Sequence, residues 1–113
     1  MAGPEGDQSR NLSPRVEALR EAARLIDSER NAVYGPPAEN FGVIARLWSE
    51  IKGIPFSAED VAMMMVAVKM GRYASGARSG AEFHADTWVD IAGYAGCGYE
   101  VGLEAKMALG PAT

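Results

Sequence analysis

Residues 86–94 read DTWVDIAGY, and this stretch has the spacing of one helix face. Asp86 and Asp90 are four residues apart, so their carboxylates project from the same side of a helix. Tyr94 follows one turn further along that side and is a candidate ligand-binding residue. The residues between them are largely apolar and supply contacts to the rest of the fold. The two carboxylates are therefore expected at the border of a core, where two like charges favour the binding of a cation.

The composition limits the class of protein. A chain of 113 residues with 48% apolar residues is long enough for one domain with a hydrophobic core. A formal net charge of −4 argues against non-specific nucleic-acid binding, which needs an excess of Lys and Arg. The longest apolar run, residues 61–68, is far shorter than the roughly 20 residues that span a bilayer. With Cys97 as the single cysteine, we expect a cytoplasmic protein with no disulfide and no membrane partner.

Apolar residues recur at helical spacing in four segments, and no segment alternates as a strand would. The fold class is therefore all-α, and we expect one domain over residues 13–108 arranged as a four-helix bundle. Residues 1–12 are rich in Gly, Pro and polar residues, which predicts a disordered N-terminal arm, and residues 109–113 are predicted to be a tail. The helices are predicted over residues 13–30, 38–52, 58–74 and 81–108.

Capping signals mark several helix ends. Ser57 and Asp60 have the spacing of a capping box, so Asp60 is more often a cap than a metal ligand. Ser79 and Glu82 have the same spacing and are predicted to cap the last helix. His84 lies near that helix start and is interpreted as a polar cap or a surface group.

The third helix contains VAMMMVAV at residues 61–68 and is apolar on all sides. Such a helix is surrounded by its own bundle or by a second subunit, so we predict a homo-oligomer, a dimer or a larger assembly. Trp48 is predicted to be a core residue of the second helix. The last helix contains four glycines after residue 92, which indicates close approach of another helix, and Cys97 among them is predicted to be a small buried hydrophobe.

The loop at residues 31–37 reads NAVYGPP and contains one aromatic residue, Tyr34. Tyr34 either packs onto the helices as a plug or stacks on the ring of a ligand. In the second case Asn40, just beyond the loop, would supply both a hydrogen-bond donor and an acceptor.

Lys69 and Arg72 lie at the end of the apolar helix, three residues apart. An antiparallel arrangement would bring them beside Asp86 and Asp90. One reading is a nucleotide site, with Mg²⁺ on the carboxylates and the cations on the phosphates. The other is an ion pair between the helices that only fixes their orientation.

The combined motifs resemble a family of small phage proteins that is frequent in actinobacterial phages. The resemblance covers roughly residues 16–101 and includes Tyr34-Gly35-x-Pro37-x-x-Asn40-Phe41, Lys69-x-x-Arg72 and Asp86-x-Trp88-Val89-Asp90-Ile91-Ala92-Gly93-Tyr94. Members of that family look like distant relatives of the MazG-like all-α nucleoside triphosphate pyrophosphohydrolases. That second resemblance implies Mg²⁺ as cofactor and hydrolysis of a nucleoside triphosphate to a monophosphate and pyrophosphate.

The acidic residues depart from the MazG-like pattern, which has an E-x-x-E pair on one helix and an E-x-x-D pair on another. Asp86 and Asp90 match the second pair in place but with a spacing of four, and the chain contains no E-x-x-E. The resemblance then implies either a metal site completed by Glu39 or Asp60, or a scaffold that binds nucleotides without hydrolysing them.

Three hypotheses follow. The leading one is a Mg²⁺-dependent pyrophosphohydrolase in which Asp86 and Asp90 are catalytic metal ligands, Lys69 and Arg72 steady the phosphates, and a water attacks a phosphoryl group. The second is a non-catalytic protein that sequesters a nucleotide or cyclic nucleotide, as a counter-defence protein would. The third is a structural or interaction module in which the aromatic and Met residues only form a core.

Overall fold

The computed structural model describes residues 12–27, 35–80 and 82–109, and these form four α-helices and no strand. The helices are α2 (Pro14–Asp27), α4 (Pro37–Lys52), α5 (Ala58–Arg78) and α6 (Ala85–Ala108). The all-α prediction is therefore confirmed for the described part of the chain. The predicted N-terminal arm up to residue 11, the end of the first predicted helix at 28–30 and the tail from residue 110 lie outside the described residues.

Local hydrogen bonds explain where α4 ends and where α5 begins. Gly53 follows α4 with a φ of 73°, and its N–H donates to the carbonyl of Ser49 at 2.8 Å. A left-handed residue at this position favours glycine. The predicted capping box of α5 is confirmed: the Asp60 N–H donates to Ser57 Oγ at 3.0 Å, and the Ser57 N–H donates to Asp60 Oδ2 at 2.8 Å. Asp60 thus acts as a cap in this structure.

The connection between α5 and α6 differs from the prediction. Helix α5 continues to Arg78 rather than ending near residue 74, and α6 begins at Ala85 rather than at 81. The predicted capping box of Ser79 with Glu82 is wrong, because the Ser79 N–H donates to the carbonyls of Ser75 and Gly76 and so ends α5. Gly80 follows with a φ of 77°, which turns the chain away. His84 takes the N-cap position of α6 without a side-chain capping bond.

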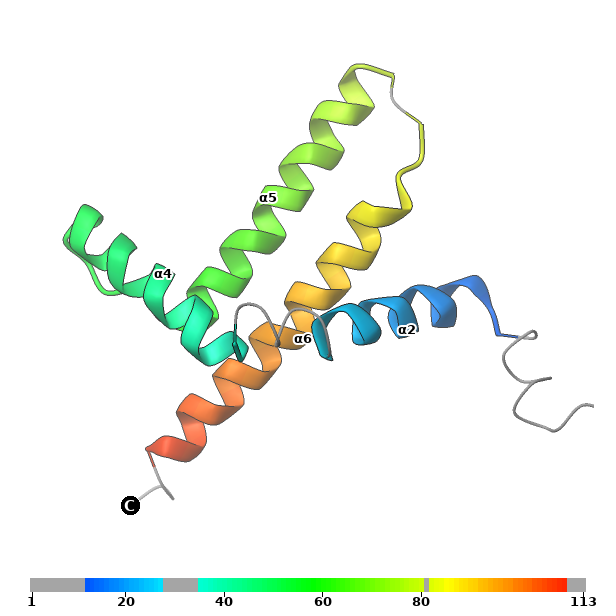
Figure 1. Cartoon of the computed structure of the whole chain (residues 1–113). Coiled ribbons are helices and arrows are strands. Elements are labelled where there is room, and N and C mark those ends of the chain that lie inside the picture. Colours follow the sequence, from blue (N-terminus) through cyan, green and yellow to red (C-terminus); the bar gives the residue numbers. More distant parts are fainter. Residues whose placement is uncertain (1–11, 28–34, 81, 110–113) are drawn as a thin grey trace, which may run out of the picture.

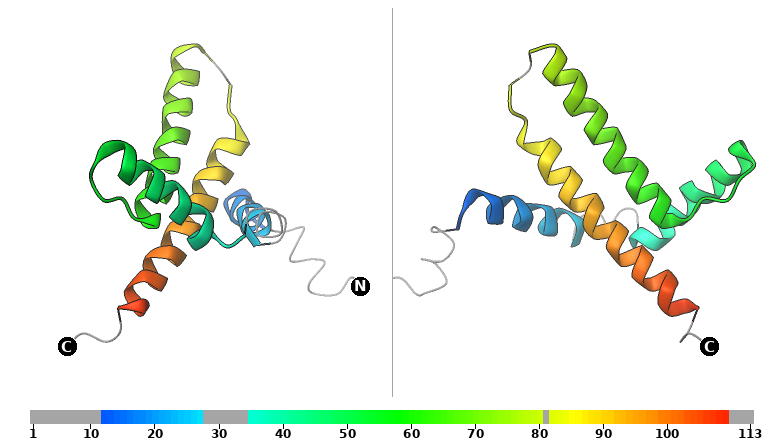
Figure 2. Two further views of the ribbon diagram at one scale, coloured as in Figure 1. Left: turned by 60° about the vertical axis from the view of Figure 1, so that its left-hand side comes forward. Right: turned by 180° about the vertical axis from the view of Figure 1, so that it is seen from behind.

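Helices α5 and α6 form an antiparallel pair, and α2 and α4 branch from it in different directions (Figures 1 and 2). The predicted close approach at the glycines of α6 is confirmed. A Cβ built on Gly98 would lie 3.1 Å from Ala62 Cβ of α5, and one built on Gly93 would lie 3.2 Å from Ile26 Cγ2 of α2. Glycine in a helix interior costs about 0.5–1 kcal/mol relative to Ala. Here the absence of that Cβ lets two helices approach α6 from different sides.

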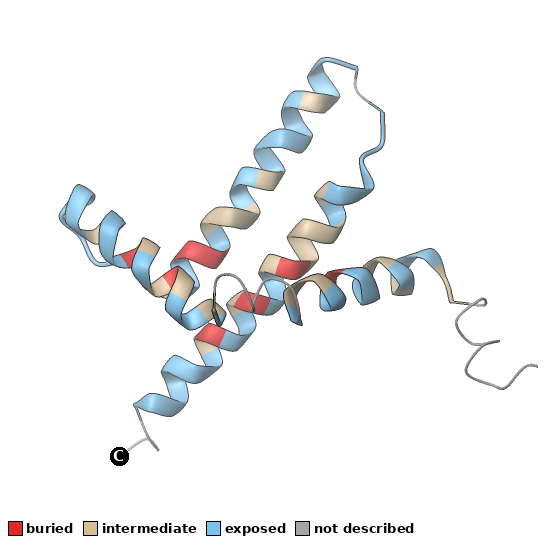
Figure 3. Ribbon diagram, in the orientation of Figure 1, coloured by how far each residue is buried: buried red, intermediate tan, exposed pale blue. Residues whose placement is uncertain are grey.

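The buried core is small and lies where α4, α5 and α6 meet (Figure 3). Cys97 is part of it, as predicted for a small buried side chain. The buried side chains of this cluster are those of Phe41, Ala45, Val61, Ala62 and Cys97.

Several large apolar side chains lie outside this core. Trp48, predicted to be a core residue, is 39% exposed, so that prediction is wrong for the single chain. Met63, in the apolar run of α5, and Met70 just beyond that run are also exposed. The helix pattern correctly indicated an apolar surface, but this surface is not covered within one chain. The homo-oligomer stays a prediction.

No helix in the described part of the chain is long and apolar enough to cross a membrane.

Candidate functional site

The antiparallel α5–α6 pair brings two of the predicted site residues into contact. Lys69 Nζ lies 3.0 Å from Asp90 Oδ2. The Lys69 side chain is only 14% exposed, whereas that of Asp90 is 37% exposed. The ammonium group is therefore largely removed from water, and Asp90 supplies its charge partner.

Asp86 and Arg72 extend this site toward the same end of the helix pair. Arg72 lies one turn beyond Lys69 on α5, and Asp86 lies one turn before Asp90 on α6. Because the helices run antiparallel, both steps lead toward the connection at residues 79–84. Asp86 and Arg72 are both exposed. The structure thus gathers the four predicted residues along one stretch of the α5–α6 pair.

The other two predicted metal ligands lie elsewhere. Asp60 precedes Lys69 by nine residues on α5, which is about 14 Å along the helix axis. Its carboxylate caps the helix start. Glu39 is in the first turn of α4, where its carboxylate folds over Gly35. No three His, Cys, Asp or Glu side chains in the described segments are grouped so that they could hold a metal ion.

The predicted ligand-binding residues Tyr94 and Asn40 lie on different helices, α6 and α4. The Tyr94 ring lies against the core, with its centroid 6.3 Å from that of Phe41. Asn40 is half-buried in the first turns of α4. Tyr34 lies outside the described residues, so its predicted role as plug or stacking ring stays a prediction.

A cavity of about 330 Å³ opens between the C-terminal half of α5 and the N-terminal half of α6. Tyr73 and Trp88 line it, and their rings meet edge to face with centroids 5.8 Å apart. Both rings are exposed on one side. The lining consists of aromatic, small and charged residues: Arg72, Tyr73, Gly76, Ala77, Glu82, Phe83, His84, Thr87 and Trp88.

Sequence reasoning missed this aromatic lining. Trp88 was expected to supply packing contacts within the opening stretch, and Tyr73 and Phe83 were assigned no role. One signal was present: Tyr73 directly follows Arg72, and Trp88 lies between the two aspartates, so an antiparallel pairing of these segments also brings the rings together.

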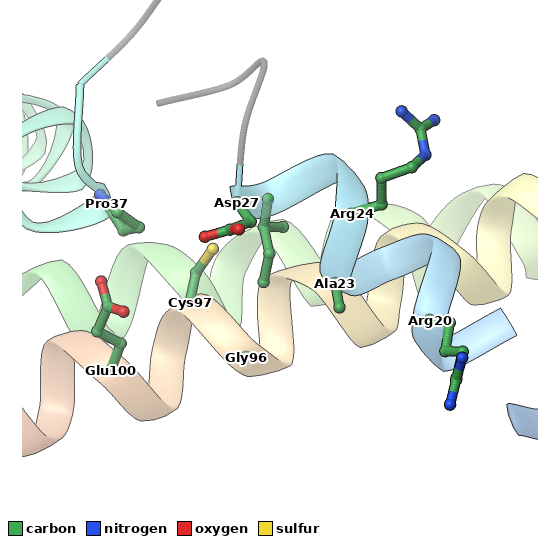
Figure 4. Close-up of a pocket in the computed structure, with 9 residues that line it drawn as sticks. Arg20, Ala23, Arg24, Asp27, Pro37, Gly96, Cys97 and Glu100 are labelled. Carbon is green, nitrogen blue, oxygen red and sulfur yellow. The ribbon is translucent and has the colours of Figure 1, made fainter. Parts of the chain in front are cut away.

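A second cavity of about 460 Å³ lies between α2, the start of α4 and α6 (Figure 4). The side chains of Arg20 and Arg24 point away from Cys97 (Figure 4). The carboxylates of Asp27 and Glu100 lie on the same side of the cavity as Cys97. Arg24 also bonds Glu21 at 2.6 Å and so lowers the pKa of that exposed carboxyl. None of the predicted ligand residues that the structure describes lines this cavity.

The carboxylates of α6 suit Mg²⁺ only as part of a metal–nucleotide complex. Mg²⁺ commonly takes one or two protein carboxylates and completes its shell with waters and substrate phosphates. Asp86 is exposed and available for this role. Asp90 contacts Lys69 through Oδ2, so a metal ligand at this residue would use Oδ1 or would require the ion pair to open.

Comparison with known proteins places the chain among phage proteins. It is 46% identical over 79 residues to the Gene 55 protein of Mycobacterium phage D29, covering 70% of this chain and 49% of the relative. It is 43% identical over 82 residues to the Gene 55 protein of Mycobacterium phage L5, covering 72% of this chain and 49% of the relative. The chain thus spans about half the length of these curated relatives. No solved structure matches it significantly.

The model of one protein family, described as a domain of unknown function (DUF6378), matches residues 17–102 and so takes in all four helices. The match includes the ion pair of Lys69 with Asp90 and the aromatic cavity beside it. On this evidence the chain belongs to the DUF6378 family.

Proposed function

We propose that the protein binds a nucleotide in the cavity between α5 and α6. The observation that carries this proposal is the placement of Arg72 in one cavity with the exposed rings of Tyr73, Phe83 and Trp88. Aromatic rings stack on nucleobases, and a guanidinium binds phosphate through charge-assisted hydrogen bonds. A volume of about 330 Å³ is at the small end of the range for ligand pockets and suits one base with its sugar.

The proposed activity is Mg²⁺-dependent hydrolysis of a nucleoside triphosphate to a monophosphate and pyrophosphate. Its support is the position of Asp86 and Asp90 on α6, whose Thr87 and Trp88 line the cavity, together with the MazG-like resemblance that we expect from the sequence motifs. Asp86 and Asp90 would hold the ion, which supplies neutralisation of phosphate charge and activation of water. Lys69 and Arg72 would bind the phosphates, and Lys69 would exchange its contact with Asp90 for one with the ligand.

Product analysis tests the activity directly. The full chain is incubated with a panel of nucleoside triphosphates and Mg²⁺, and monophosphate and pyrophosphate are quantified. We expect turnover that is lost in Asp86→Asn and Asp90→Asn but kept in Glu104→Gln, which removes an exposed acid near the other end of the same helix. Turnover of the wild type no higher than that of Asp90→Asn would refute hydrolysis.

A second candidate function, binding without hydrolysis, is favoured by the ion pair itself. Lys69 is the charge partner of Asp90 at 3.0 Å, and the described residues contain no group of three His, Cys, Asp or Glu side chains that could hold a metal ion. A protein of this kind would sequester a nucleotide or a cyclic nucleotide signal, as a counter-defence protein does. It would return its ligand intact and would bind equally well after chelation of Mg²⁺.

Tryptophan fluorescence separates binding from catalysis. Trp48→Phe leaves Trp88 as the single tryptophan, so quenching on nucleotide addition reports stacking in the cavity. We expect Arg72→Gln to weaken binding about tenfold or more through loss of a charged hydrogen bond. Arg78→Gln, on the same helix but outside the cavity lining, should bind as the parent does. Failure of every nucleotide to quench Trp88 would leave only the role of an interaction module.

The proposed assembly is a homo-oligomer acting in the cytoplasm of the host cell. The support for assembly is the exposure of large apolar side chains on α4 and α5.

A further inference from the structure

Helix α4 has two apolar faces, and the chain itself covers only one of them. Phe41 and Ala45 on the inner face are buried against α5 and α6. On the outer face, Val43, Leu47 and Ile51 recur every four residues and are all exposed. The helix projects from the α5–α6 pair in Figure 1 and in the right-hand view of Figure 2, and the exposure of these three side chains makes the outer face accessible. We call Val43, Leu47, Ile51 and the following Ile54 the α4 stripe.

We propose that a second copy of this chain packs on the α4 stripe, α4 against α4 in antiparallel orientation about a two-fold axis near Leu47. The inference rests on the proposed homo-oligomer and names its surface. In such an isologous contact Val43 of one copy faces Ile51 of the other, and Leu47 meets its own counterpart.

The α4 stripe supports a small interface between two copies. With the flanking Trp48, these residues expose roughly 500 Å² per copy, so a contact that covers them in full buries at most about 1,000 Å², near the lower bound for a specific interface. The composition also fits, because aliphatic and aromatic side chains occupy its centre and charged residues its rim.

The charges beside the α4 stripe are self-complementary. Arg46 and Glu50 lie one turn apart on one flank, and both are exposed. In an antiparallel helix pair, the same flank of each helix faces that of the other. Arg46 of one copy then lies opposite Glu50 of the second copy, and the reverse contact repeats about the axis. In a parallel arrangement this flank would face the opposite flank of the second copy, so the contact of Arg46 with Glu50 would not form.

Sedimentation equilibrium of the full chain over a range of concentrations tests the surface. We expect the wild type to be dimeric and Leu47→Glu to dissociate, with its dimer Kd raised about 100-fold or more. Leu19→Glu is the matched control, because Leu19 on α2 is 60% exposed and Leu47 is 58% exposed. It should remain dimeric. Far-ultraviolet circular dichroism checks that each variant keeps its helices.

Charge reversal provides an independent readout. Arg46→Glu and Glu50→Arg should each raise the dimer Kd about threefold to tenfold, and the double reversal should restore it, since the opposite charges face each other again.

The outcomes separate this inference from the proposals it rests on. A dimer that persists in Leu47→Glu, or a double reversal that stays weak, overturns the α4 surface and leaves the oligomer to another face. A monomeric wild type overturns both the proposed α4 surface and the proposed homo-oligomer. The α4 stripe would then have no second copy of this chain as its partner. Neither result changes the nucleotide test, which reads Trp88.

Discussion

Replacing Asp90 by asparagine tests whether the Lys69–Asp90 contact stabilises the fold. The Lys69 side chain is 14% exposed, so its ammonium group has few waters to replace a lost carboxylate. Removing the partner of a buried charge is costly, whereas removing an exposed one costs little. Asp90 is 37% exposed, which allows water to screen the pair and places the cost at the low end of the range. We expect Asp90→Asn to lower the free energy of unfolding by about 1–2 kcal/mol.

Replacing the other partner, Lys69, should lower the free energy of unfolding by less. Lys69→Met removes the charge but keeps most of the apolar stem that packs between the helices, and the carboxylate left behind remains partly hydrated. We expect a loss of about 0–1 kcal/mol. In the double variant no unpaired charge remains, so its loss should be smaller than the sum of the two single losses by about 1 kcal/mol.

Urea denaturation followed by circular dichroism measures all four proteins at one fixed protein concentration, because a dimer's stability depends on concentration. Equal losses in the two single variants, together with additivity in the double variant, would refute the reasoning. That result would mean that Lys69 is hydrated in solution and that the 3.0 Å contact contributes nothing to the pairing of α5 with α6.

Two further predictions concern helix packing and a surface ion pair. Gly98→Ala should destabilise by about 1–2 kcal/mol, because its Cβ would lie 3.1 Å from Ala62 Cβ, which cannot rotate away. Gly96→Ala meets only the end of a flexible side chain at 3.3 Å and should be neutral or stabilising; equal urea midpoints would contradict this contrast. The pKa of Glu21 is lowered by its hydrogen bond from Arg24, so this pair stabilises α2 above the unfolded-state pKa and ceases to do so as pH falls through the lowered one. An NMR titration should show that pKa rising toward its ordinary value in Arg24→Gln, and an unchanged value would refute the assignment.

The helices were predictable wherever their ends depend on local chemistry. Ser57 with Asp60, and Gly53 after α4, mark ends that neighbouring residues determine. The segment after Arg78 was not predictable in this way. Ser79 and Gly80 can end one helix as readily as Ser79 can start the next, and the choice depends on how far α5 extends before it loses contact with α6.

The ion pair could be anticipated because an antiparallel pair joined by a short connection has few possible registers. The same register brings Tyr73 to Trp88, but it does not predict that these rings line an open cavity. Apolar spacing predicts that Trp48 and Trp88 face a partner, but it does not say whether that partner is the same chain, a ligand or a second copy. Both residues were assigned to packing within the fold, and both are exposed in the single chain.

The residue sizes along α6 account for the position of the cavity. Ala62 with Gly98, Lys69 with Asp90, and Tyr73 with Trp88 follow one antiparallel register along the two helices. At the first pair only small side chains intervene, so the helices are in close contact. Toward the connection the facing residues become large, and rings held edge to face keep the helices apart, which opens a space of about 330 Å³ beside Trp88. Gly98 of α6 keeps one end of the pair in close contact, and the bulky residues near the connection leave a cavity at the other end. The opening stretch DTWVDIAGY spans the transition between these two ends, so its Thr87 and Trp88 line the cavity whereas its Tyr94 packs against the core.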